Sequence, residues 1–147
     1  MSNADTTGNG ETASRLGDAL IELWRTWRLA SHPVVKGTIT PEQYWLLRRL
    51  KRRGALPVSE LARGINITNG SATTATKRLE RAGFVTRERQ DADQRVVLVS
   101  LTADGNAAIA QWNDVQRTAL FGLVSRASEE EQRTLLAIVE KILGQGE

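Results

Sequence analysis

Hydroxyl, amide and cationic side chains recur at helical spacing in the segment 68–82. The small residues Ala72, Ala75 and Thr76 share one side of the predicted helix, which leaves the other side free. The free face carries Asn69, Gly70, Ser71, Thr73, Thr74, Lys77, Arg78 and Arg81. Hydroxyls and amides can hydrogen-bond to base edges in a DNA major groove, while cations reach the phosphates on its rim. The alternative interpretation is a polar surface that only faces solvent.

The stretch RERQDADQRVVLVSLT, residues 87–102, contains a second candidate site. β-Branched residues on both sides of QDADQ predict a hairpin with strands over 84–89 and 95–101. Within a strand, Asp93 and Arg95 would lie on the same face, so the carboxylate could hold the guanidinium extended. An arginine held in this way fits the narrow minor groove of DNA, whereas an Asp-x-Arg turn considered alone is usually structural.

The elements that must position these residues are mostly helices. Thr40, Pro41 and Gln43 predict a capping box with proline at the first helical position, and Ser128 with Glu131 predicts another. The predicted order is helices over 14–31, 41–53, 57–63 and 68–82, the hairpin over 84–101, and helices over 102–126 and 128–143. Two short helices joined by a tight turn form a helix-turn-helix, so the sequence predicts a mainly α winged helix-turn-helix with a small β-hairpin wing.

Basic residues gather in the middle of the 147-residue chain. Residues 48–89 hold eleven basic and three acidic side chains, whereas 1–47 and 90–147 each carry more acids than bases. A basic segment between neutral or acidic ends is typical of a segment that binds a polyanion. A solvated helix face would have the same composition.

The composition also excludes several classes of protein. The absence of cysteine excludes disulfides, thiolate zinc sites and thiol redox switches, and a single histidine, His32, argues against an imidazole-rich metal site. The sequence shows no nucleophile beside a base, no metal-ligand cluster and no phosphate-binding glycine loop, so we expect no cofactor and no enzymatic activity. No apolar run approaches roughly 20 residues, and the polar start of the chain lacks the apolar segment of a signal peptide, so we expect a cytoplasmic location and no membrane partner.

The segment from Leu61 to Gly105 carries a resemblance to a known family. It reads LARGINITNGSATTATKRLERAGFVTRERQDADQRVVLVSLTADG, which resembles the signature of the MarR (multiple antibiotic resistance regulator) family of bacterial winged-helix transcription factors. The pattern R-x5-D-x-R-x5-L-T-x2-G is met by Arg87, Asp93, Arg95, Leu101, Thr102 and Gly105. The order of the helices extends the resemblance across residues 14–144.

This resemblance implies a homodimer whose two winged helices bind a palindromic double-stranded DNA operator. It places DNA contacts on the helix 68–78 and on Arg95 at the wing, with Asp93 orienting that arginine. The candidate DNA-binding residues are Thr68, Asn69, Ser71, Thr73, Thr74, Lys77, Arg78, Arg87, Asp93 and Arg95. Gln94 and Thr74 stand where the family often has basic residues, so affinity and operator sequence are expected to differ from those of relatives.

The expected organisation has four parts. They are a disordered tail over 1–13, an N-terminal dimerisation helix over 14–36, the DNA-binding winged helix-turn-helix over 37–102 and C-terminal dimerisation helices over 103–147. The terminal helices support dimerisation independently, because their apolar stripes exceed what one small winged helix can cover. Packing within one chain is the alternative.

A small aromatic effector is the last expectation. Many members of the resembled family release DNA when such a molecule binds between the dimerisation and DNA-binding regions. The residues that would meet there are Trp24, Trp27, Arg28, His32, Tyr44, Trp45 and Trp112. Aromatics around one or two cations suit an aromatic carboxylate, whereas ordinary core aromatics beside a surface arginine are the alternative.

The sequence therefore predicts a dimeric, sequence-specific transcriptional regulator, expected to be a repressor. The alternative is a winged-helix module that coats DNA without sequence choice or binds another protein. Competition with random duplex DNA separates the two.

Overall fold

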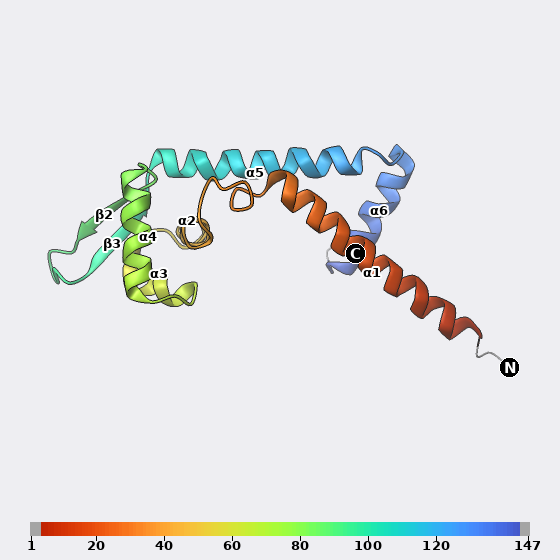
Figure 1. The fold of residues 1–147 in the computed structure, drawn as a ribbon, viewed down its shortest axis with the longest axis horizontal. Coiled ribbons are helices and arrows are strands. Elements are labelled where there is room, and N and C mark those ends of the chain that lie inside the picture. The colour runs from red at the N-terminus through yellow and green to blue at the C-terminus, as the bar shows by residue number, and fades with distance from the viewer. Residues whose placement is uncertain (1–3, 145–147) are drawn as a thin grey trace. The chain divides into compact units, whose positions relative to one another are not determined.

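Six helices and three short strands make up residues 4–144, the part of the chain that the computed structural model describes (Figure 1). The elements are α1 Ala4–Ser31, α2 Pro41–Arg53, β1 Leu56–Pro57, α3 Val58–Gly64, α4 Asn69–Arg81, β2 Val85–Arg89, β3 Val97–Leu101, α5 Ala103–Val124 and α6 Glu129–Ile142. They form two compact units. One is the continuous stretch 32–114, and the other combines the chain up to residue 31 with the chain from residue 115 onward.

Local capping sets the bounds of α2. The Thr40 hydroxyl accepts a hydrogen bond from the backbone N–H of Gln43 at 3.3 Å, and the Gln43 side chain accepts one from the backbone N–H of Thr40 at 3.1 Å. Pro41 follows at the first helical position, where its missing N–H costs nothing. Gly54 ends the helix with φ +80°, a conformation that glycine adopts without a steric penalty. The predicted capping box and helix are confirmed.

The three strands form one antiparallel sheet in the order β1-β3-β2. β2 and β3 are the predicted hairpin, and their register pairs Val85 with Leu101 and Arg89 with Val97. The sequence did not predict β1, whose Leu56 pairs with Val99 of β3. Two residues are too few to show the alternation by which a strand is recognised.

The core of the unit 32–114 lies where α2, α3 and α4 meet the sheet. Its most deeply buried large side chains are Leu46, Leu47, Leu50, Leu61, Leu79, Val85, Val99 and Ile109. The predicted inward face of α4 is confirmed, because Ala72, Ala75 and Thr76 are buried, and Leu79 is buried with them. The Thr76 hydroxyl donates to the backbone oxygen of Ala72 at 2.8 Å, so its polar atom is satisfied inside the core.

α1 departs from the predicted disordered tail. It begins at Ala4, so residues 4–13 are helical, while residues 1–3 lie outside the described part of the chain. No proline interrupts the segment, and once a helix is nucleated it can propagate at the gain of one hydrogen bond per residue. The end of the helix at Ser31, just before His32 and Pro33, agrees with the prediction.

The second unit joins α1 to the C-terminal part of α5 and to α6. The indole N–H of Trp27 donates to the backbone oxygen of Gln116 at 2.7 Å, which ties α1 to α5. Ser128 and Glu131 form the predicted capping box at the start of α6. Many of the apolar side chains of this unit stay exposed, among them Leu16, Leu20, Ile21, Leu29, Leu120, Phe121, Leu136, Ile138, Ile142 and Leu143. No residue of α6 is buried.

The helices of residues 4–144 include no candidate for a membrane-spanning segment.

Candidate nucleic-acid interface

The free face of α4 is a ridge of polar side chains with a hollow on each side. Its exposed candidates are Asn69, Ser71, Thr74, Lys77 and Arg78, while Thr73 is half-buried. Thr68 caps the helix, since its hydroxyl oxygen accepts from the backbone N–H of Ser71 at 3.1 Å. A ridge of one helix fits a major groove about 12 Å wide.

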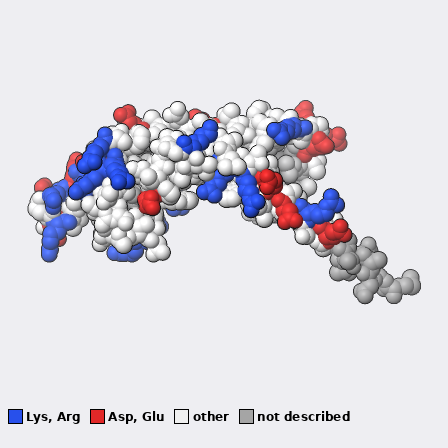
Figure 2. Space-filling view, viewed as in Figure 1, with Lys and Arg blue, Asp and Glu red and all other residues white. Residues whose placement is uncertain are grey.

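The hollow between α4 and the wing has a volume of about 610 Å³. Its polar and charged lining comprises Ser59 from α3, Asn69, Thr73, Lys77 and Glu80 from α4, and Arg87, Arg89 and Arg95 from the wing. Four of its five charged side chains are cations. Figure 2 shows Lys and Arg side chains gathering over the wing and α4 on the visible face. Such a surface attracts the phosphate backbone of DNA.

The second hollow, about 360 Å³, lies between α4 and the start of α2. Ser71, Thr74 and Arg78 line it from α4, and Thr40, Glu42 and Gln43 line it from the α2 cap. The candidate residues of α4 therefore divide into two rows, one facing the wing and one facing α2.

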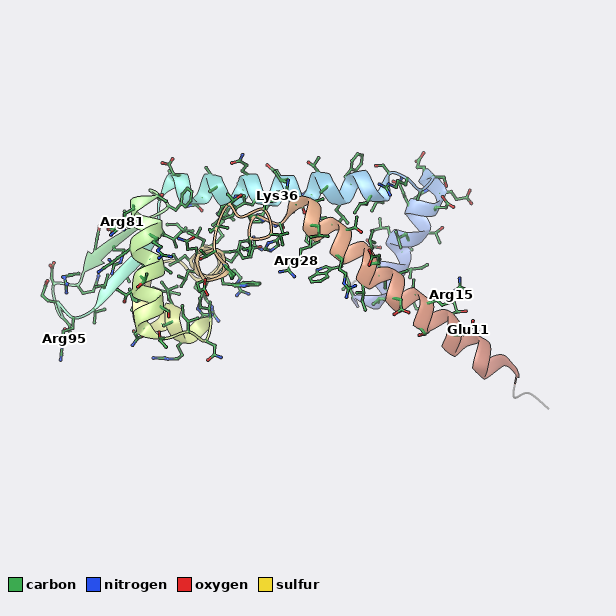
Figure 3. The ribbon with its side chains drawn as sticks, in the orientation of Figure 1. Glu11, Arg15, Arg28, Lys36, Arg81 and Arg95 are labelled. Carbon is green, nitrogen blue, oxygen red and sulfur yellow. The ribbon has the colours of Figure 1, made fainter. Side chains whose placement is uncertain are left out.

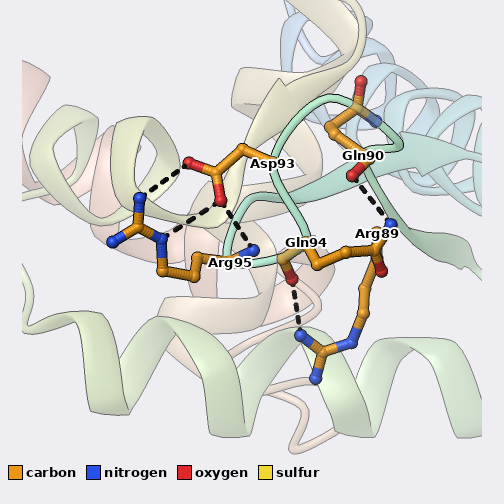
Figure 4. Close-up of polar contacts among 5 residues, drawn as sticks. All are labelled: Arg89, Gln90, Asp93, Gln94 and Arg95. Carbon is orange, nitrogen blue, oxygen red and sulfur yellow. Dashed lines mark hydrogen bonds and ion pairs between the residues drawn. The ribbon is translucent and has the colours of Figure 1, made fainter.

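At the wing tip, Asp93 holds both the backbone and the side chain of Arg95. Asp93 Oδ1 accepts hydrogen bonds from the backbone N–H of Arg95 at 3.0 Å and from its guanidinium Nε at 3.2 Å, and Oδ2 lies 3.5 Å from Nη2 (Figure 4). The Arg95 side chain is still 91% exposed and projects from the wing (Figure 3). The predicted pairing is confirmed, but the reason given for it is wrong. Both residues lie in the turn before β3, so they do not share a strand face. The arginine is aligned by the hydrogen bond from its backbone N–H to the Asp93 carboxylate.

The same contacts keep Asp93 ionised. The hydrogen bond from the Arg95 side chain, followed by that from the Arg95 backbone, lowers the pKa of the Asp93 carboxyl below its ordinary value of 3.8. The acid therefore carries its full charge at neutral pH.

Arg89 closes the turn from the other strand. Its guanidinium donates to the backbone oxygen of Gln94 at 2.7 Å, and the Gln94 amide donates to the backbone oxygen of Gln90 at 3.1 Å (Figure 4). Arg89 was missing from the predicted site, although it lies within the basic segment 48–89. Gln94 stands where a basic residue is common in the resembled family, and its hydrogen bonds to Arg89 and Gln90 stabilise the turn.

Arg87 has a different environment from the other candidate cations. Its side chain is only 13% exposed, and its Nη1 lies 3.8 Å from Oε2 of Glu80 on α4. Its Nε is buried without a hydrogen-bond partner among the described residues. Arg87 thus points between the sheet and α4, whereas Arg95 points into solvent.

Part of the basic run on α2 has structural partners. Arg48 donates to the Asn113 side chain at 2.9 Å, and Lys51 donates to the Asn106 side chain at 2.7 Å. These two cations tie α2 to α5 inside the unit 32–114, so the positive charge of residues 48–53 is not all free for a polyanion.

The predicted effector residues divide between the two units. Tyr44 packs within ring-contact distance of His32, Trp45 and Trp112, with centroids 4.8, 5.2 and 6.3 Å apart. Tyr44 is buried, while Trp45 is 55% exposed. The remaining candidates belong to the other unit, where the Arg28 guanidinium lies 5.1 Å from the ring centroid of Trp24. No cluster of histidine and acidic residues that could hold a metal ion occurs in the described part of the chain.

The chain is similar in sequence to many known proteins. The model of a family described as MarR family matches residues 39–97. The chain is 26% identical to the "Uncharacterized HTH-type transcriptional regulator YwhA" of Bacillus subtilis over 130 residues, 88% of this chain and 94% of that protein. It is 32% identical to the "HTH-type transcriptional regulator FarR" of Neisseria gonorrhoeae over 110 residues, 73% of this chain and 75% of that protein.

The fold is also similar to solved structures. One is a mutant of MepR from S. aureus bound to an oligodeoxyribonucleotide, and it aligns with a TM-score of 0.72 at 23% identity over 90% of this chain and 96% of that one.

Proposed function

The chain belongs to the MarR family of HTH-type transcriptional regulators, and from that premise we propose that it binds a palindromic operator as a homodimer and represses transcription there. It is a DNA-binding regulator and not an enzyme. In the proposed complex, α4 enters the major groove and Arg95 enters the adjacent minor groove.

The observation that carries this proposal is the presentation of Arg95. An arginine side chain that is 91% exposed would ordinarily sample many conformations, and a turn that fixes it on Asp93 serves no packing purpose. A narrow minor groove has an enhanced negative potential, which a projecting arginine matches. The exposed hydroxyls and cations of α4 suit base edges and phosphates in the wide groove.

The proposed dimer rests on the apolar surface of the second unit. Leu136, Ile138, Ile142 and Phe121 stay exposed on α6 and α5, and exposed apolar patches of this kind mark interaction surfaces. A symmetric pair also supplies two reading helices, which would engage half-sites about one helical turn, roughly 34 Å, apart. The oligonucleotide-bound MepR mutant is a precedent for DNA binding by a protein of the same fold, and the dimer itself rests on the exposed apolar surface.

A small aromatic effector is a second proposal, supported by the exposed Trp24, whose ring centroid lies 5.1 Å from the Arg28 guanidinium. The burial of Tyr44 supports the alternative that part of the set is ordinary core. Titration with benzoate, followed by tryptophan fluorescence and by release of bound operator, tests it. Cyclohexanecarboxylate is the control, because it keeps the charge and lacks the aromatic ring.

Selection of bound sequences from a random duplex pool tests the proposed function. We expect an inverted repeat with half-site centres about 10 base pairs apart. A pool that shows no enrichment would favour a protein that coats DNA or binds another protein. Enrichment of a single, unrepeated half-site would contradict the dimer and leave sequence-specific binding intact.

A further inference from the structure

The DNA-facing hollow contains one acid whose position a cationic binding surface does not explain. Glu80 lines this hollow with Lys77, Arg89 and Arg95, and its side chain is 44% exposed. A carboxylate there repels the phosphates of bound DNA and so lowers affinity. Its presence therefore calls for a role other than DNA contact.

The partner of Glu80 is Arg87. Arg87 lies opposite the fully buried Val99 in the register of β2 and β3, and directly opposite residues of an antiparallel pair point to the same face. Val85, two residues earlier on β2, is also buried on that face. The Arg87 side chain is therefore enclosed between the sheet and α4, and Nη1 lies 3.8 Å from the Glu80 carboxylate.

An enclosed guanidinium needs a compensating charge. The Nε of Arg87 has no hydrogen-bond partner in the described part of the chain, so the ion pair with Glu80 is the polar contact that the structure gives this side chain. A partly buried pair is screened less by salt than an exposed one, which makes it suitable as a fixed link between two elements.

We propose that Glu80 and Arg87 are positioning residues that brace the wing against α4 and thereby set the reach of Arg95 into the minor groove. The inference rests on the proposed function, in which α4 and the wing occupy adjacent grooves of one duplex. The spacing between those grooves is fixed by DNA, so binding requires a fixed offset between helix and wing. A brace at the base of the wing controls that offset without touching DNA.

The direction in which one substitution changes operator affinity separates this role from simple electrostatics. Glu80→Gln is nearly isosteric and removes a negative charge that faces DNA. Electrostatics alone predicts tighter operator binding, whereas loss of the brace predicts binding weakened by about tenfold, within the range measured for coupled residues. Glu88→Gln is the matched control, because Glu88 is exposed on the outer face of the same strand, β2, and we expect its operator affinity to be unchanged or slightly higher.

The effect of Arg95→Ala on operator affinity, compared between the parent and the Glu80→Gln protein, provides a second test. A merely structural role of Glu80 would leave that effect unchanged. If the wing is misplaced in the Glu80→Gln protein, adding Arg95→Ala should weaken operator binding by no more than about twofold, although the same change in the parent costs about tenfold. Thermal unfolding is recorded for each protein. Glu80→Asp keeps the charge but shortens the side chain, so it should lose about threefold in affinity without a charge change and serves as a second test if Glu80→Gln unfolds.

The outcomes are distinguishable by fluorescence anisotropy on one selected operator. The inference is supported if Glu80→Gln and Glu80→Asp weaken binding and the effects of Glu80→Gln and Arg95→Ala fail to add. It is overturned, with the proposed function intact, if the parent prefers its operator and both Glu80 variants bind as tightly as the parent or tighter. If the parent itself shows no preference among duplexes, both the inference and the proposed function fail.

Discussion

The Asp93 carboxylate binds Arg95 through its backbone N–H and its Nε and leaves most of the arginine side chain in solvent. The acid thus restricts the arginine without covering it. Because the guanidinium keeps donors for another partner, the pair can present a cation to DNA at a small cost in conformational entropy.

Arg95→Ala should weaken binding to the selected operator by at least about tenfold, because it removes the minor-groove contact. The oligomeric state, measured by light scattering, should not change. A gel-shift titration that returned the parental affinity would show that the wing tip has no role in binding.

Asp93→Asn should reproduce part of the Arg95→Ala defect, since an amide holds a guanidinium less strongly than a carboxylate. The pKa of Asp93 is lowered, so in the parent the contact is present above its ordinary value of 3.8 and is lost as the pH falls through the still lower folded value. Asp93 should therefore cause no pH dependence of operator affinity between roughly pH 5.5 and 8, well above both values. If operator affinity changed with pH inside that window in the parent but not in Asp93→Asn, the proposed ionised state of Asp93 would be wrong.

Two residues of α4, one from each row, should give different kinds of defect. Lys77→Ala should weaken binding to every duplex and lower the slope of log affinity against log salt by about one, because it removes a phosphate contact. Thr74→Ala should change which operator is selected and leave that slope unchanged. Identical behaviour of the two variants in selection and in salt titration would remove the distinction between base and phosphate contacts.

Gly105→Ala should destabilise the DNA-binding unit by about 1–3 kcal/mol, the usual cost of overpacking. A Cβ at this position in α5 would overlap the Phe84 backbone oxygen, which cannot move away because the Phe84 oxygen also accepts from the backbone N–H of Thr102. Chemical denaturation measures the effect. Gly122→Ala is the control on the same helix, where a Cβ meets nothing within 4 Å, and it should cause no loss of stability.

Ile138→Glu should dissociate the proposed dimer. Ile138 lies on the exposed apolar stripe of α6 with Leu135 and Ile142, and a buried unpaired carboxylate there is unfavourable. Glu140→Lys, off that stripe, also changes the charge of α6 and should leave the dimer intact. Sedimentation velocity measures both, and a parent protein that sediments as a monomer would contradict the dimer directly.

Features governed by local sequence were predictable. The capping pairs Thr40–Gln43 and Ser128–Glu131 act across three residues, and the inward face of α4 follows from helical spacing. Long-range features were not predictable in the same way. The enclosure of Arg87 depends on how α4 packs on the sheet, and β1 depends on its pairing with β3, where Leu56 and Pro57 lie opposite Val99 and Leu98, far along the chain.

The pairing of Asp93 with Arg95 was predicted for an incorrect reason. Alternation along a strand places residues two apart on one face, but the strand begins only at Val97. The turn achieves the same approach because the Asp93 carboxylate chelates the backbone two residues on, a property of aspartate in turns. The aspartate at position 93 therefore determined the contact with Arg95, whereas the predicted strand did not.

The most direct test of sequence-specific recognition by α4 and the wing compares the affinity for the selected operator with that for a scrambled duplex of the same length and composition. Both are measured by fluorescence anisotropy at one physiological salt concentration. Sequence-specific recognition should give a preference of at least about 10³-fold for the operator. Equal dissociation constants for the two duplexes would contradict it.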